Sequence, residues 1–167
     1  MDRGATSPCL FAHSRMTQMR RRAVAAFCLG IAALWFLGGN AFSLESTSRI
    51  AGPVIEWILP GSSLVSSRML FTIFRKLLHF FLYGGLALLA LRMLILSSVP
   101  PIRASLLAIG LTLAVGMADE GRQALSENRT GRWSDVLIDA VGAVGAVGAA
   151  GVGVFCVNRL RISKRDS

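Results

Sequence analysis

Charged residues are scarce in this chain of 167 residues, where Lys, Arg, Asp and Glu make up 16% of the sequence and hydrophobic residues 53%. Soluble domains usually carry about 25% charged residues, so the deficit argues against an ordinary soluble protein. The hydrophobic residues come in long runs, which is typical of helices that cross a membrane. The sequence therefore predicts an integral membrane protein of the all-α class.

Residues that commonly bind metals are also few, with three cysteines and two histidines. Cys28 and Cys156 lie inside apolar runs and Cys9 near the N-terminus, with no CxxC or Cys/His spacing among them. Buried cysteines often act as small apolar side chains. We therefore expect no metal and no cofactor.

The net charge of +9 would suggest a nucleic-acid partner in a soluble protein. Here the basic residues stand beside the apolar runs, where they orient a protein in a membrane. No nucleic-acid-binding motif accompanies them. The expected partner is the lipid bilayer, and no nucleic acid.

Four apolar runs predict a transmembrane four-helix bundle. They are Ala23–Gly39, which can extend to Leu44, Leu77–Ser98, Ile102–Ala118 and Val136–Val157. The first run is short, since about 20 residues cross the hydrocarbon core. Arg20–Arg22, this run and the "AFS" at 41–43 also resemble a signal peptide, so cleavage remains an alternative. Between the first two runs, Glu45–Phe74 is interpreted as a mixed linker broken by Pro53 and Pro60.

The distribution of charge predicts the orientation of the bundle. We divide the chain into a basic tail (1–22), a transmembrane domain (23–157) and a second basic tail (158–167). With both termini on one side, that side holds eleven basic residues, and the other holds seven basic residues with seven of the nine acids. Basic residues favour the cytoplasmic side. Both termini are therefore expected in the cytoplasm, and the charges of the extracytoplasmic end are expected to pair.

Polar residues at three places should meet at this extracytoplasmic end. Lys76, His79 and Tyr83 share one predicted helical face. Near the end of the third run, Gly116, Glu120 and Gln123 share a face, and Asp119 and Gln123 form another pair at i, i+4. Asp135 and Asp139, also at i, i+4, begin the last helix. Ionisable groups at membrane depth are costly unless they pair or face water. The three groups therefore predict one polar site, although helix capping and salt bridges that only lock the helix ends are the alternative.

These residues resemble the motifs of the VanZ-like family. "RKLLHFFLY" is similar to its R-K-x-x-H-F-x-x-Y segment, "DEGRQ" to its D-E-x-x-Q segment, and "RTGRWSDVLIDAVG" to its R-x-G-x-x-x-D-x-x-x-D/N-x-x-G segment. The motifs occur in the family's order over about residues 25 to 155. The residues matched are Arg75, Lys76, His79, Phe80, Tyr83, Asp119, Glu120, Gln123, Arg129, Gly131, Asp135, Asp139 and Gly142.

The chain departs from the family pattern at three places. Glu127 and Asn128 stand where Pro-Gly is common before the motif arginine, Leu82 where many members have glutamate, and Arg122 where histidine is frequent. The loss of one acid and one histidine weakens the case for a proton relay along these positions.

The resemblance implies a multi-pass protein of the bacterial cytoplasmic (inner) membrane and a role at the cell envelope. The namesake of the family is an accessory protein associated with teicoplanin resistance, a form of antibiotic resistance. We expect a non-enzymatic module that binds an envelope lipid, a lipoglycopeptide-type molecule or a membrane partner protein. Two alternatives stay open: an intramembrane enzyme acting on an envelope lipid or phosphate ester with His79 as acid or base, and a bundle whose charges only stabilise the fold.

Overall fold

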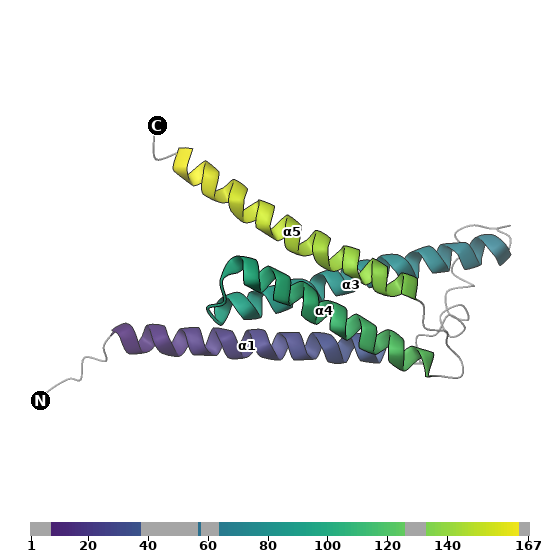
Figure 1. Ribbon diagram of the computed structural model, residues 1–167, viewed down its shortest axis with the longest axis horizontal. Coiled ribbons are helices and arrows are strands. Elements are labelled where there is room, and N and C mark those ends of the chain that lie inside the picture. Colours follow the sequence, from purple (N-terminus) through teal and green to yellow (C-terminus); the bar gives the residue numbers. More distant parts are fainter. Residues whose placement is uncertain (1–7, 38–56, 58–63, 126–132, 164–167) are drawn as a thin grey trace, which may run out of the picture.

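The computed structural model describes residues 8–37, Trp57, residues 64–125 and residues 133–163. In these residues the chain forms α1 (Pro8–Leu37), α3 (Leu64–Leu96), α4 (Pro101–Ala124) and α5 (Trp133–Ser163) (Figure 1). No strand occurs within the described ranges. The predicted all-α fold is confirmed.

Three of the helices are long and apolar enough to cross a membrane, over Thr72–Leu96, Pro101–Ala124 and Ser134–Val157. The first half of α1 instead carries Arg15 and Arg20–Arg22, and its apolar part is described from Ala23 to Leu37. That length is short of the roughly 20 residues that span the hydrocarbon core. The fourth crossing stays a prediction.

Two helices begin earlier than the sequence predicted. α1 already includes residues 8–22 of the basic tail, and α3 begins at Leu64, within the predicted linker. The physical reason is that no Pro or Gly interrupts the chain from Cys9 to Leu29 or from Leu64 to Tyr83, and these two residues are the main helix breakers. The start of the predicted linker, and Pro53 and Pro60 in it, lie outside the described residues.

α3 is the central helix, because it packs against α1, α4 and α5. Its contact with α5 is close: a Cβ at Gly84 would lie 3.1 Å from the carbonyl oxygen of Gly142, and a Cβ at Gly142 would collide with the backbone of Phe80. Small residues let membrane helices approach in this way. Buried side chains from all four helices form the core, namely Phe27, Leu34, Tyr83, Leu86, Ala87, Ala90, Ala108, Ala143 and Val147.

A tight turn at residues 97–100 joins α3 to α4. Ser98 has a φ of 62°, and the amide of Val99 donates to the carbonyl oxygen of Leu94 at 3.1 Å. Pro101 then opens α4 at a position where a missing N–H costs nothing. The turn makes the two helices antiparallel, so the end of α4 returns beside the first half of α3.

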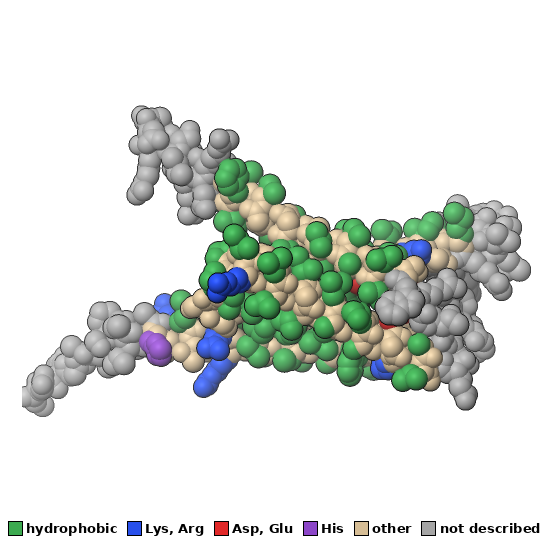
Figure 2. All heavy atoms as spheres, in the orientation of Figure 1, with side chains coloured by type: hydrophobic (Ala, Val, Ile, Leu, Met, Phe, Trp, Pro, Cys, Tyr) green, Lys and Arg blue, Asp and Glu red, His purple; other side chains and the backbone are tan. Residues whose placement is uncertain are grey.

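The molecule has two ends of different character. The start of α1, the α3–α4 turn and the end of α5 lie at one end, here called the turn end (Figure 1). The start of α3, the end of α4 and the start of α5 lie at the other, here called the site end. Hydrophobic side chains cover most of the face shown in Figure 2, and acidic side chains are nearly hidden from view. This apolar surface suits a lipid environment.

Candidate functional site

Every acidic residue within the described ranges is buried, and all of them lie at the site end. Asp119 and Glu120 come from the last turns of α4, whereas Asp135 and Asp139 come from the first turns of α5. Their residues are between 0% and 7% exposed. Charged groups are almost never buried without partners, so the site depends on what these carboxylates contact.

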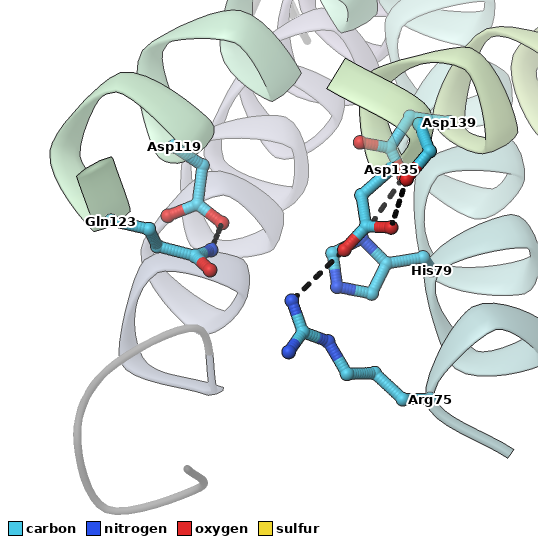
Figure 3. Close-up of polar contacts among 7 residues, drawn as sticks. Arg75, His79, Asp119, Gln123, Asp135 and Asp139 are labelled. Carbon is cyan, nitrogen blue, oxygen red and sulfur yellow. Dashed lines mark hydrogen bonds and ion pairs between the residues drawn. The ribbon is translucent and has the colours of Figure 1, made fainter. Parts of the chain in front are cut away.

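Two carboxylates of α5 bind two side chains of α3 (Figure 3). Nη2 of Arg75 donates to Oδ2 of Asp135 at 2.9 Å. One turn further along both helices, Nδ1 of His79 lies 3.1 Å from Oδ1 of Asp139. The spacing of four residues on each helix is one turn, so the two contacts are stacked along the α3–α5 interface.

A third carboxylate organises the end of α4. Asp119 accepts hydrogen bonds from Nη2 of Arg122 at 2.8 Å and from Nε2 of Gln123 at 2.8 Å. Arg122 also donates to the backbone carbonyl oxygen of Trp35 at 3.4 Å. This hydrogen bond links α4 to the end of α1. Polar contacts at the site end therefore join α3 to α5 and α4 to α1.

Tyr83 lies between the α3–α5 pairs and α4. It is 2% exposed, and its ring stacks on that of His79 with a centroid distance of 5.8 Å. On α4, a Cβ at Gly116 would lie 3.3 Å from the Tyr83 ring and 3.2 Å from Oδ2 of Asp139. The absence of a side chain at Gly116 lets α4 close against this tyrosine and this aspartate.

The residues predicted from the sequence are mostly brought together. We call the set the polar cluster: Arg75, His79, Tyr83, Asp119, Glu120, Arg122, Gln123, Asp135 and Asp139. The predicted Asp119–Gln123 pair forms as expected. The predicted residues Arg129 and Gly131 lie outside the described residues.

Lys76 is the exception among the described members. The sequence grouped it with His79 and Tyr83 on one face, but its side chain is exposed, whereas Arg75 binds α5. The physical reason is that positions i, i+4 and i+8 follow one helical face, and residues 75, 79 and 83 have this spacing. This face therefore includes Arg75, His79 and Tyr83 and leaves Lys76 outside it.

Two features of the site went unrecognised in the sequence. The contact of Arg122 with the Trp35 carbonyl joins residues 87 positions apart, and no periodicity signals it. From the sequence, Gly116 was noted only as sharing a helical face with Glu120 and Gln123. Within the residues described, no group of three His, Cys, Asp or Glu side chains has an arrangement that could hold a metal ion.

These observations define a class of protein: a multi-helix membrane protein with a buried polar cluster near one end of its spans. Comparison with known families places it further, because the model of the VanZ/LLP1 family matches residues 23–155. This match covers most of the chain, and the protein belongs to the VanZ/LLP1 family. No curated protein and no solved structure matches the chain significantly.

Proposed function

We propose that this protein is a non-enzymatic module of the bacterial cell envelope that binds an amphiphilic anionic molecule through the polar cluster. The proposal rests on the exposure of the Arg75 side chain and on its unused hydrogen-bond donors. Its side chain is 30% exposed, while its partner Asp135 is only 7% exposed and fixes the guanidinium. Among the described contacts only Nη2 is engaged, and a guanidinium has five N–H donors. The remaining donors suit the bidentate recognition of phosphate or carboxylate.

The expected ligands are an envelope lipid or a lipoglycopeptide-type molecule, with a membrane partner protein as the other possible occupant. Apolar residues of α3 beside Arg75, among them Ile73, Phe74 and Leu77, are exposed. An anionic headgroup at Arg75 would therefore have apolar surface next to it for its chains. Family membership supports an envelope role, since the namesake is associated with resistance to teicoplanin-like molecules.

A direct binding measurement tests this proposal. The purified protein in phosphatidylcholine nanodiscs is titrated with a labelled polyprenyl phosphate, and with the uncharged polyprenol as the matched ligand. We expect Arg75→Ala to weaken phosphate binding by about 10-fold or more, as for loss of a charge-assisted hydrogen bond. The control is Arg92→Ala, since Arg92 is exposed toward the turn end. Equal binding of polyprenol, or unchanged binding by Arg75→Ala, would refute the proposal.

The same proposal requires the site end to face outward. Arg15, Arg20–Arg22, Arg92 and Arg103 lie toward the turn end, whereas the basic residues of the site end are accompanied by the buried acids. Positive charge favours the cytoplasm, which supports cytoplasmic termini and a site end that faces outward.

Sidedness can be measured by thiol labelling of intact cells. With the three native cysteines changed to serine, Leu125→Cys reports the site end, where Leu125 is 89% exposed, and Ser98→Cys reports the turn end. We expect an impermeant thiol reagent to label position 125 in intact cells and position 98 only after permeabilisation. The reverse pattern would point to a cytoplasmic ligand instead.

One observation favours the second candidate function, an enzyme that uses His79. An imidazole held at Nδ1 by a buried carboxylate is oriented as general acids and bases often are. Within the described residues, however, no Ser, Thr or Cys hydroxyl or thiol is hydrogen-bonded to His79. Release of phosphate from the labelled polyprenyl phosphate by the wild-type protein, lost in both His79→Gln and His79→Ala, would favour the enzyme.

A further inference from the structure

The His79–Asp139 pair lies within two helical segments that are long and apolar enough to cross a membrane. His79 belongs to Thr72–Leu96 and Asp139 to Ser134–Val157. Ionisable residues within membrane-spanning helices are costly to build and commonly mark ion or proton sites.

One oxygen of this pair has no hydrogen-bond partner among the described residues. Asp139 has a side chain that is 1% exposed, and its Oδ1 is bound by His79. Its Oδ2 is buried and makes no hydrogen bond. The backbone of α4 closes over this oxygen, since a Cβ at Gly116 would lie 3.2 Å from it. A buried anionic oxygen without a donor is unfavourable, and a proton is the cation that fits beside it.

The described charged groups around Asp139 are engaged with other partners or add negative charge. From α3, Arg75 is engaged by Asp135, and Tyr83 carries no charge of its own near neutral pH. From α4, Asp119 is engaged by Arg122 and Gln123, and Glu120 adds another buried carboxylate. From α5, Asp135 is the other acid. Among the described residues, Oδ2 of Asp139 is thus left without a hydrogen-bond donor.

We propose that His79 and Asp139 form an intramembrane proton-binding site. The pair takes a proton from the aqueous phase on the Arg75 side, where the His79 side chain is still 17% exposed, and returns it there. The proton bonds to nitrogen or oxygen of the pair, and no other bond forms or breaks. This site is distinct from ligand binding by Arg75, and it holds whether or not an amphiphile binds.

Histidine spectroscopy can test the pair directly, because the chain has only two histidines. In a His13→Gln background, where the exposed His13 is removed, ring ¹⁵N signals report His79 alone across a pH titration in nanodiscs. Infrared difference spectra follow the carboxylic C=O band of Asp139 in the same samples. We expect the ring and the carboxyl to change with the same midpoint, as coupled sites do, with uptake of about one proton per chain.

Matched variants decide the outcome. Asp139→Asn should remove the carboxyl band and move the His79 midpoint by about one pH unit or more, whereas Lys76→Gln, at an exposed neighbouring position, should leave both unchanged. If Asp139→Asn does not fold, His79→Gln gives the complementary test, since the Asp139 band should then titrate with a different midpoint. A carboxyl band that never titrates, or a His79 midpoint equal in wild type and Asp139→Asn, would overturn the proposal.

Discussion

Arg75 and His79 lie one helical turn apart on α3, and each contacts a different carboxylate of α5. The two contacts differ in exposure: the Arg75 side chain is 30% exposed and that of His79 is 17% exposed, and their partners Asp135 and Asp139 are 7% and 1% exposed. Removal of one partner from a buried pair leaves a charge without compensation, which usually costs more than the pair contributes. At the scale of single residues, burial of Asp135 and Asp139 therefore depends on their partners Arg75 and His79.

This dependence predicts the result of a double-mutant cycle at Arg75 and Asp135. Arg75→Ala alone should lower the free energy of unfolding by about 1–3 kcal/mol, because it leaves the Asp135 carboxylate buried without its cationic partner. The double variant with Asp135→Ala should recover part of this loss. Thermal or denaturant unfolding in detergent measures both, with Lys76→Ala as the exposed control. Strictly additive effects would show that the two side chains are not coupled.

At the scale of elements, the α3–α5 contact positions the two pairs. Gly142 lies one turn after Asp139 on the same helix, and its Cα faces the backbone of Phe80, the residue after His79. A flexible side chain can move aside for an added methyl group, whereas a helix backbone cannot do so without moving the helix. The distance between α3 and α5 is thus set by a glycine next to the site.

A methyl group at Gly142 should therefore separate the helices. We expect Gly142→Ala to lower stability by about 1–3 kcal/mol or more through overpacking and to weaken the His79–Asp139 contact. Gly148→Ala is the matched control, because nothing lies within 4 Å of a Cβ there; it should be neutral or slightly stabilising, since alanine favours helix. Unfolding curves and the His79 ring signals report the two effects. Similar stability of both variants would contradict the close contact.

At the scale of the whole molecule, charge is sorted between the two ends. Basic residues near the turn end have no acidic residue among the described residues around them, whereas those of the site end lie beside buried acids. Among the described residues, the turn end therefore carries the excess of positive charge. An excess of this kind favours the cytoplasmic side during insertion, so we expect the orientation of the site to depend on residues far from it.

Neutralising the turn end should disturb the orientation without touching the site. This test uses the Leu125→Cys variant described for thiol labelling. We expect the fraction of molecules labelled at position 125 in intact cells to fall when five arginines are replaced by glutamine, namely Arg20, Arg21, Arg22, Arg92 and Arg103. Lys76→Gln, at the site end, should leave that fraction unchanged. Labelling of position 125 that stays complete in the multiple variant would show that another feature sets the orientation.

Several features of this protein could be predicted because they depend on local pattern. Long apolar runs define membrane helices whatever they pack against, and Asp119 and Gln123 pair because four residues make one turn. The starts of α1 and α3 were missed because the charged residues near Arg20 and the mixed residues after Leu64 form helix without being apolar. The choice of Arg75 over Lys76 was missed because both are basic and adjacent, and only the rotation of α3 distinguishes them.

The sequence by itself determined the helical class, the membrane environment and the family, because each follows from composition, periodicity and motif spacing along the chain. It also determined which residues could form a polar site. Only the tertiary structure decided the pairing: Arg75 with Asp135, His79 with Asp139, and Arg122 with both Asp119 and the Trp35 carbonyl. The physical reason is that these contacts depend on the rotation and spacing of helices. Gly84 and Gly142 set that spacing through backbone contact, and Gly116 through contact with the side chains of Tyr83 and Asp139.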